Sequence, residues 1–226
     1  MLGLPDGITA ALFDLDGVLT DTAAVHERAW KQSFDAYLGA RGTFEHDDYN
    51  RYVDGKPRED GIRDFLASRD IHPSDADVDT LSTTKNDLVL RLIHDEGVKR
   101  YEGSARYLQA AKDAGLRRAL VSSSHNAEEL LDVTGLAAYI EERIDGHVKD
   151  ELNLRGKPAP DTFLEAAKRL GVPPEQAAVF EDAQAGVAAG RAGNFGRVIG
   201  VDRVGQREAL LEHGADVVVD DLSELL

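Results

Sequence analysis

The chain of 226 residues contains no cysteine and carries little positive charge. Without cysteine it can form no disulfide, bind no metal through thiolates and use no catalytic thiol, which suits a reducing compartment. Lysine and arginine number 26 against 42 aspartates and glutamates, so the formal net charge is -16. Such a polyanion is a poor partner for nucleic-acid backbones or anionic lipid, so we expect neither nucleic acid nor membrane as a partner.

Long apolar runs are also missing from the sequence. No stretch reaches about 18 uninterrupted apolar residues, so no membrane-spanning helix is predicted. The first residues, Met1 to Asp6, lack the basic segment and apolar segment of a secretion signal. Hydrophobic residues nevertheless make up 42% of the chain, which is typical of a globular protein. We therefore expect a cytoplasmic, unanchored protein, and a monomer.

Short apolar runs alternate with amphipathic stretches along most of the chain. The runs predict buried strands over residues 8–15, 118–121, 178–180, 197–201 and 215–219. The stretches between and after them predict helices over residues 105–114, 127–133, 161–170 and 184–192, and glycine follows three of these. This alternation predicts an α/β fold with a Rossmann-like parallel sheet that helices cover on both faces.

Residues 23–99 interrupt this alternation. They contain no β-branched run, and their pattern predicts helices over residues 23–38, 59–68 and 74–94. The strand and helix alternation resumes afterwards, which indicates an all-helical cap domain inserted into the core. We therefore predict a catalytic core of residues 1–22 and 100–226, joined to a cap of residues 23–99 by two crossings that form a hinge.

Two aspartates end the first predicted strand. Asp14 and Asp16 stand two residues apart, and strand residues at that spacing point to the same side. Ligands bind at the carboxyl ends of parallel strands, and Gly17 gives the backbone freedom to turn away over that edge. The alternative is that an acidic chain contains such a pair by chance, with aspartates that cap turns.

Polar residues follow two other predicted strands. Val121 leads into Ser122, and Phe180 leads into Glu181 and Asp182. Carboxylates gathered at one edge of the sheet would repel one another strongly, so this arrangement requires a cation. Because the available ligands are oxygens, Mg²⁺ is the expected metal. Alternatively, Ser122 and the Glu181–Asp182 pair cap the helices that follow them.

Lys157 lies in a segment with two prolines just before a predicted helix. Most surface lysines are only solvated, but a lysine fixed at the mouth of an acidic crevice can neutralise a carboxylate and a bound phosphoryl group. A nucleophilic carboxylate, a second carboxylate that carries a proton, a hydroxyl and an ammonium together predict phosphoryl transfer through an aspartyl phosphate.

These motifs resemble those of the haloacid dehalogenase superfamily over nearly the whole chain. They occur in the order Asp14-Leu15-Asp16-Gly17-Val18, Ser122, Lys157 and Glu181-Asp182. The resemblance implies that Asp14 is the nucleophile and that Asp16 is the general acid and base. It implies that Ser122 and Lys157 orient and neutralise the transferred phosphoryl group. It also implies that Mg²⁺ is held by Asp14, the main-chain carbonyl of Asp16, Glu181 and Asp182.

Further residues resemble the β-phosphoglucomutase branch of that superfamily. The substrate-binding residues that this similarity implies are Thr22, His26, Trp30, Gly55, Arg58, Lys85, Ser124, His125 and Asn126. Arg58 and residues 124–126 are expected to hold the phosphate that is not transferred, and Lys85 to contact the sugar. His125 stands where that branch has a lysine, and histidine titrates near about 6.5, so the contact to the distal phosphate is expected to depend on pH.

The implied reaction converts β-D-glucose 1-phosphate into glucose 6-phosphate through β-glucose 1,6-bisphosphate, with small sugar phosphates as the partners. Two other functions stay open: a phosphatase that hydrolyses small phosphate monoesters on the same core, and a sugar-phosphate-binding protein without activity. Apart from the resemblance, Arg58 is simply an exposed cation, Trp30 packs between cap helices and His26 is a buried structural histidine.

Overall fold

A computed structural model describes residues 2–226, which contain a six-stranded parallel sheet. The strands are β1 (Ala10–Phe13), β2 (Arg117–Val121), β3 (Glu142–Ile144), β4 (Ala177–Glu181), β5 (Arg197–Val201) and β6 (Val217–Val219). Their spatial order is β3-β2-β1-β4-β5-β6, and every neighbouring pair is parallel. All four residues of β1 are buried at the centre of the sheet. The predicted α/β fold with a parallel sheet is confirmed.

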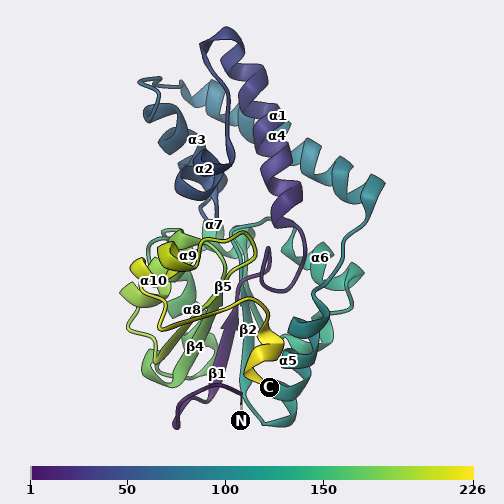
Figure 1. The fold of residues 1–226 in the computed structure, drawn as a ribbon, viewed down its shortest axis with the longest axis vertical. Coiled ribbons are helices and arrows are strands. Elements are labelled where there is room, and N and C mark those ends of the chain that lie inside the picture. The colour runs from purple at the N-terminus through teal and green to yellow at the C-terminus, as the bar shows by residue number, and fades with distance from the viewer. Residues whose placement is uncertain (1) are drawn as a thin grey trace.

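Helices cover both faces of the sheet (Figure 1). On one face lie α5 (Glu102–Asp113) and α6 (Ala127–Val133), and on the other lie α8 (Asp161–Leu170), α9 (Gln184–Ala192) and α10 (Arg207–Glu212). The side chains of β1 alternate between the two cores, with Phe13 in the first and Leu12 in the second. The sheet is therefore buried on both sides, as continuous apolar strands require.

The strands predicted over residues 8–15 and 215–219 are too long, since the second pairs only over Val217–Val219, and one strand was missed. The strand predicted over residues 8–15 pairs only over Ala10–Phe13, and the chain turns away through Gly17, whose φ is +77°. Asp14 and Asp16 therefore follow the strand rather than ending it, and the alternation expected to point them to the same side does not apply to them. The edge strand Glu142–Ile144 was not predicted, because it has three residues and two of them are charged.

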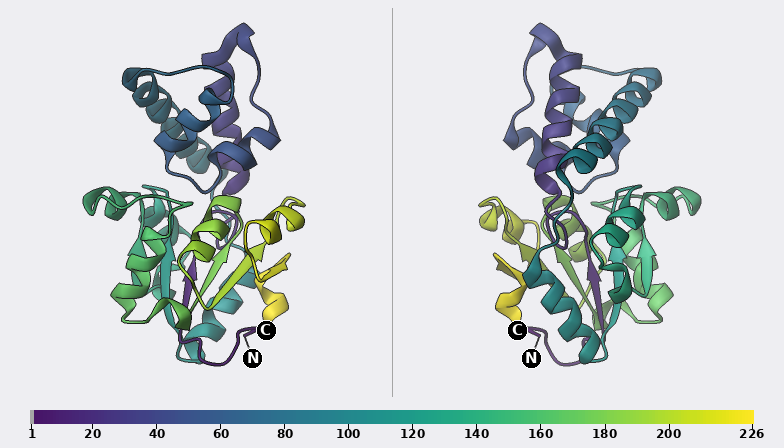
Figure 2. Two further views of the ribbon diagram at one scale, coloured as in Figure 1. Left: turned by 90° about the vertical axis from the view of Figure 1, so that its left-hand side faces the viewer. Right: turned by 90° about the vertical axis from the view of Figure 1, so that its right-hand side faces the viewer.

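The segment between β1 and α5 is helical and lies beyond the carboxyl ends of the strands, whereas both termini lie at the opposite end (Figures 1 and 2). Its elements, in chain order, are α1 (Ala23–Leu38), a 3-10 turn (Gly39–Arg41), α2 (His46–Asp48), a π-helix (Tyr49–Val53), α3 (Arg58–Ala67) and α4 (Asp75–Glu96). Its own core is aromatic, with Phe34 stacked on Trp30 and Phe44 and tilted against Phe65. The domain boundaries at residues 22 and 99 stay a prediction.

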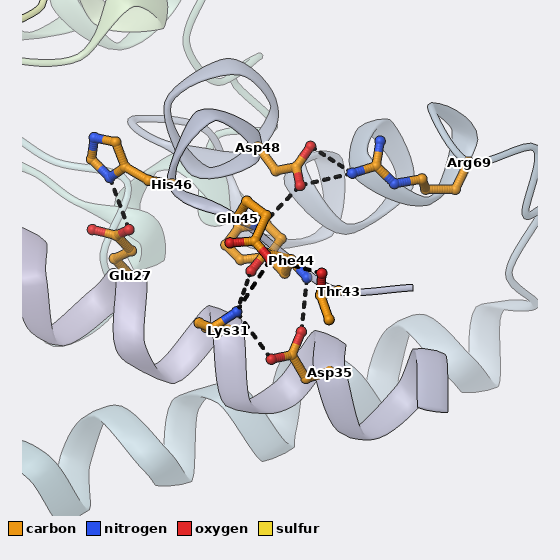
Figure 3. Close-up of polar contacts among 9 residues, drawn as sticks. All are labelled: Glu27, Lys31, Asp35, Thr43, Phe44, Glu45, His46, Asp48 and Arg69. Atoms are coloured by element: carbon orange, nitrogen blue, oxygen red, sulfur yellow. Dashed lines mark hydrogen bonds and ion pairs between the residues drawn. The ribbon is translucent and has the colours of Figure 1, made fainter. Parts of the chain in front are cut away.

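Polar contacts fix the start of the π-helix within the cap, as Figure 3 shows. Lys31 of α1 donates to the carbonyl of Phe44 at 2.6 Å, and the Phe44 amide donates to Asp35 at 2.8 Å. Arg69 donates to both carboxylate oxygens of Asp48 at 2.8 Å. The chain that enters the π-helix therefore starts from a position held by α1 on one side and by the end of α3 on the other.

Within the described chain, none of the helices combines the length and apolar character that crossing a lipid bilayer requires.

Candidate active site

A small cavity lies between the cap helices and the carboxyl ends of the strands, with a volume of about 60 Å³. Ten of the predicted site residues line it: Asp14, Asp16, His26, Trp30, Gly55, Arg58, Lys85, Ser124, Asn126 and Asp182. Four more are buried around it, namely Thr22, Ser122, Lys157 and Glu181. His125 instead lines an adjoining open cavity of about 420 Å³, together with Arg58 and Asn126. The structure thus gathers nearly all predicted residues at one place.

Three buried carboxylates form the centre of the site. Ligand oxygens of Asp14, Glu181 and Asp182 lie within 4.8 Å of one another. The Lys157 Nζ donates to Asp14 Oδ1 at 2.5 Å, to Glu181 Oε1 at 2.5 Å and to the carbonyl of Val121 at 3.0 Å. Burial alone would lower the pKa of Lys157, but the charges of Asp14 and Glu181 outweigh it and raise that pKa. Lys157 is therefore a charged counter-ion at neutral pH.

The single positive charge of Lys157 does not neutralise the three carboxylates of Asp14, Glu181 and Asp182. Burial, and then repulsion by neighbouring carboxylates, raises the pKa of Asp14 and of Asp182 well above the usual range, although Lys157 acts in the opposite direction on Asp14. Oxygen donors at this density, left with excess negative charge, fit a hard divalent cation such as Mg²⁺. Asp14, Glu181 and Asp182 are the residues that could hold it.

The backbone at Gly17 allows Asp182 to reach this group. Gly17 adopts φ +77°, and a Cβ there would lie 1.7 Å from Asp182 Oδ2. Asp14 is positioned by the end of β1, where its amide donates to the Phe180 carbonyl at 2.9 Å. Parallel pairing of β1 with β4 therefore brings the first and last acidic motifs together, as the sequence predicts.

Asp16 points away from the three carboxylates and towards the cap. Its Oδ1 accepts a hydrogen bond from Thr22, and it lies 3.5 Å from Nε2 of His26. Lys85 lies 2.9 Å from Nδ1 of the same ring. Burial, and then the charge of Arg58, lowers the pKa of Lys85 to about 7. When Lys85 is protonated it only donates, so Nδ1 then accepts and Nε2 carries the proton on the side of Asp16. Burial, and then the charge of Lys85, lowers the pKa of His26 to about 4, so the ring is neutral.

Hydrogen bonds hold the residues expected to bind the phosphate that is not transferred. Arg58 of the cap donates to Asn86 Oδ1 at 2.9 Å, and Asn126 of the core donates to the same oxygen at 3.3 Å. His125 bonds Asp150 at 2.9 Å and contacts the His147 ring edge-on. Arg58 and Asn126 therefore converge on one oxygen from the cap and from the core, whereas His125 is turned towards Asp150.

Six residues of the lining were not predicted as site residues: Tyr49, Val53, Asp54, Lys56, Asn86 and Ser123. Tyr49 and Asp54 belong to the turn around the π-helix, whose hydrogen bonding follows neither the helical nor the strand period that sequence patterns register. The only available signal was the acidic residue directly before Gly55.

The chain is similar to known proteins over most of its length. A family model for haloacid dehalogenase-like hydrolases matches residues 8–194. A β-phosphoglucomutase of Mycobacterium tuberculosis (strain CDC 1551 / Oshkosh) is 51% identical over 247 residues, covering 100% of this chain and 94% of the relative. A β-phosphoglucomutase of Bacillus subtilis (strain 168) is 35% identical, covering 96% and 91%. The crystal structure of a β-phosphoglucomutase from Clostridium difficile superposes with a TM-score of 0.82 at 28% identity, covering 97% and 93%.

Proposed function

The chain belongs to the haloacid dehalogenase-like hydrolase family and is an enzyme, and from this premise we propose that it is a phosphohexomutase that interconverts β-D-glucose 1-phosphate and glucose 6-phosphate. The observation that carries the proposal is the pairing of two features in one cavity. Asp14 lies beside Lys157 and two further carboxylates, and His26 of the cap faces Asp16 of the core. The first feature suits phosphoryl transfer, and the second suits control of the acceptor by the cap.

In this mechanism a hydroxyl of the sugar monophosphate loses its proton to Asp16 and attacks phosphorus of phosphorylated Asp14, and the bond from that phosphorus to the Asp14 oxygen breaks. In the second half, Asp14 attacks the other phosphorus of the resulting bisphosphate, the phosphorus–oxygen bond to the sugar breaks, and Asp16 gives a proton to the departing oxygen. Lys157 and Ser122 hold the phosphoryl oxygens. The bisphosphate formed in between must be bound in either orientation, with Arg58, Ser124 and Asn126 holding the phosphate that is not reacting.

We infer that Mg²⁺ is bound by Asp14, Glu181, Asp182 and the carbonyl of Asp16. When bound, it supplies positive charge that offsets the carboxylates and the phosphoryl oxygens. The support comes from the carboxylate spacing and from the raised pKa of Asp14 and of Asp182.

Magnesium is expected to stabilise the protein more at pH 8 than at pH 5. A carboxyl with a raised pKa in the folded state costs stability as pH rises from its unfolded value near about 3.9 through the folded value. A bound cation removes that cost, so its benefit appears where the carboxyls are ionised. At a hundredfold excess over Kd the gain is about 2.7 kcal/mol, or roughly 5–10 °C in Tm.

This prediction is checked by thermal unfolding with MgCl₂ or with NaCl of equal ionic strength at both pH values. Asp182→Asn should lose most of the magnesium-specific shift. Asp113→Asn, an exposed position on α5, should keep it. Equal shifts at pH 5 and pH 8 would contradict the expected site.

The test of the function follows both products at once. The protein, Mg²⁺, β-glucose 1-phosphate and a trace of the 1,6-bisphosphate are mixed, and glucose 6-phosphate and inorganic phosphate are measured by phosphorus NMR. A mutase forms glucose 6-phosphate with little free phosphate. Predominant release of inorganic phosphate would overturn the proposal and favour the phosphatase.

Asp16→Asn is expected to lower turnover by about 10²–10⁴-fold, the usual contribution of a positioned proton carrier. Magnesium binding should persist, because the proposed ligand from this residue is its main-chain carbonyl. The measurements are steady-state turnover and the magnesium-dependent Tm of the same preparation. A variant with wild-type turnover would remove Asp16 from the mechanism.

The cytoplasmic location and the monomeric state stay predictions.

A further inference from the structure

A carboxylate from the cap enters the catalytic cavity at Asp54. The π-helix Tyr49–Val53 precedes it, and the Asp54 amide donates to the Tyr49 carbonyl at 2.9 Å. Such single π-turns occur frequently at functional sites. This one places both Tyr49 and Asp54 in the cavity lining, together with Asp14, Asp16 and Asp182 of the core.

The residue after Asp54 anchors this segment to the core. Ser123 donates from Oγ to the carbonyl of Gly55 at 2.9 Å. Gly55 has φ +71°, and a Cβ there would lie 2.7 Å from Cβ of Ala183, so the cap backbone touches the core at this point. Asp54 is therefore held at a defined distance from the catalytic carboxylates whenever the cap is in this position.

Asp54 has acceptor capacity that the protein leaves available. The two buried lysines of the site donate elsewhere, Lys157 to Asp14 and Glu181, and Lys85 to His26. The group of carboxylates within 4.8 Å of one another comprises Asp14, Glu181 and Asp182, among residues 2–226, and does not include Asp54. Burial, and then the charges of Glu181 and Asp16, raises the pKa of Asp54 to about 7, while the Tyr49 phenol acts in the opposite direction.

These surroundings define the ligand group that suits Asp54. A phosphate or carboxylate there would be repelled by Asp54 and by the acidic centre beside it. A neutral hydroxyl donates to a carboxylate without adding charge, and such a charge-assisted bond is stronger than a neutral one. Arg58 also lines the cavity. In the proposed function Arg58 holds one phosphate and Lys157 the other, which leaves the hydroxylated ring of the sugar for Asp54.

We propose that Asp54 is a specificity-determining residue that accepts a hydrogen bond from a ring hydroxyl of the bound sugar, and so selects polyhydroxylated phosphate esters over phosphate esters and acyl phosphates without a hydroxylated ring. This inference rests on the proposed function, because it requires a sugar phosphate in the cavity.

The experiment compares wild-type protein, Asp54→Ala and Asp47→Asn, a control that removes a charge from an exposed position of α2. The substrates are β-glucose 1-phosphate and its 2-deoxy, 3-deoxy and 4-deoxy analogues, and kcat/KM is measured for each. Wild-type protein and Asp47→Asn should lose on the order of 10- to 100-fold on one analogue. Asp54→Ala should lose that factor on the parent sugar and lose little more on the same analogue.

A second measurement separates substrate contact from damage to the acidic centre. Acetyl phosphate has no sugar hydroxyl, so the rate at which it phosphorylates Asp14 should be the same in Asp54→Ala as in wild-type protein within about threefold. An equal loss with acetyl phosphate would overturn the proposal, and so would an equal penalty for every deoxy analogue in both proteins. If wild-type protein releases phosphate instead of forming glucose 6-phosphate, the proposed function fails. The comparison of deoxy analogues still tests Asp54 in that case, with the rate of phosphate release as the measurement.

Discussion

Asp14→Asn is expected to reduce turnover on the order of 10⁶-fold, which is the typical effect of removing an enzyme's nucleophile. The amide that replaces the carboxylate cannot form the aspartyl phosphate, so both halves of the proposed reaction stop. The substitution preserves shape and still offers an oxygen to Lys157, which now lies 2.5 Å from Asp14 Oδ1. We therefore expect a folded protein that fails at the chemical step.

The measurements for Asp14→Asn are turnover, and intact-protein mass after incubation with acetyl phosphate or the 1,6-bisphosphate. Wild-type protein should gain one phosphoryl group, and the variant should gain none. Asp113→Asn serves as the matched control, because it makes the same change at an exposed position. A phosphorylated Asp14→Asn variant, or one with more than about a hundredth of normal turnover, would assign the nucleophile to another residue.

Lys157→Met is expected to cost about 3–5 kcal/mol of unfolding free energy in metal-free buffer at pH 8, because it leaves buried carboxylates without their counter-ion. The side chain of Lys157 is 1% exposed and contacts Asp14, which is 8% exposed, and Glu181, which is 0% exposed. Solvent therefore screens this pair very little. Methionine fills a similar volume, so the loss reports on charge rather than on a cavity.

The dependence on pH follows from the direction of the shifts. The pKa of Lys157 is raised, so its contribution is complete at neutral pH and is lost only as pH rises through the folded value, above about 10.4. The pKa of Asp14 is raised, so this carboxyl takes up its proton at a higher pH than an ordinary aspartate does. Lys157→Met should accordingly lose less stability at pH 5 than at pH 8.

Chemical denaturation in the presence of a chelator measures this effect. Lys157→Met combined with Glu181→Gln removes both partners of one contact and should recover part of the loss, as a double-mutant cycle would report. Lys168→Met is the control, because Lys168 pairs with Glu165 on the surface and is 77% exposed. An exposed pair contributes at most about 1 kcal/mol. A Lys157→Met protein as stable as this control would mean that Lys157 does not offset the acidic centre.

The catalytic core was largely predictable because its signals are local. Each acidic motif follows an apolar run, and the ends of parallel strands must meet at one edge of a sheet. The prediction of Asp14 and Asp182 in one cavity needed only that rule. The orientation of Asp16 was less accessible, because the strand ends at Phe13 and the direction of Asp16 depends on Thr22 and His26.

The cap residues that line the cavity were predictable only in part. Arg58 and Lys85 could be found through resemblance, but Tyr49 and Asp54 owe their place to a π-turn that has no periodic signature. The distance of Tyr49 and Asp54 from the core is set by contacts between residues far apart in the chain. Examples are Gly55 against Ala183 and Gly156 against Pro57. A single sequence carries no pattern that records how closely two such backbones approach.

The lining of the catalytic cavity bears on how the activity of this enzyme can be controlled. Residues of the cap, such as Trp30 and Arg58, and residues of the core, such as Asp14 and Ser124, enclose it together, so a hexose that carries two phosphates can reverse its orientation only when cap and core separate. In the proposed reaction the enzyme must therefore release the bisphosphate halfway through every cycle. An enzyme molecule that does not rebind it is left with unphosphorylated Asp14, so the concentration of free bisphosphate sets the fraction of the enzyme that is phosphorylated.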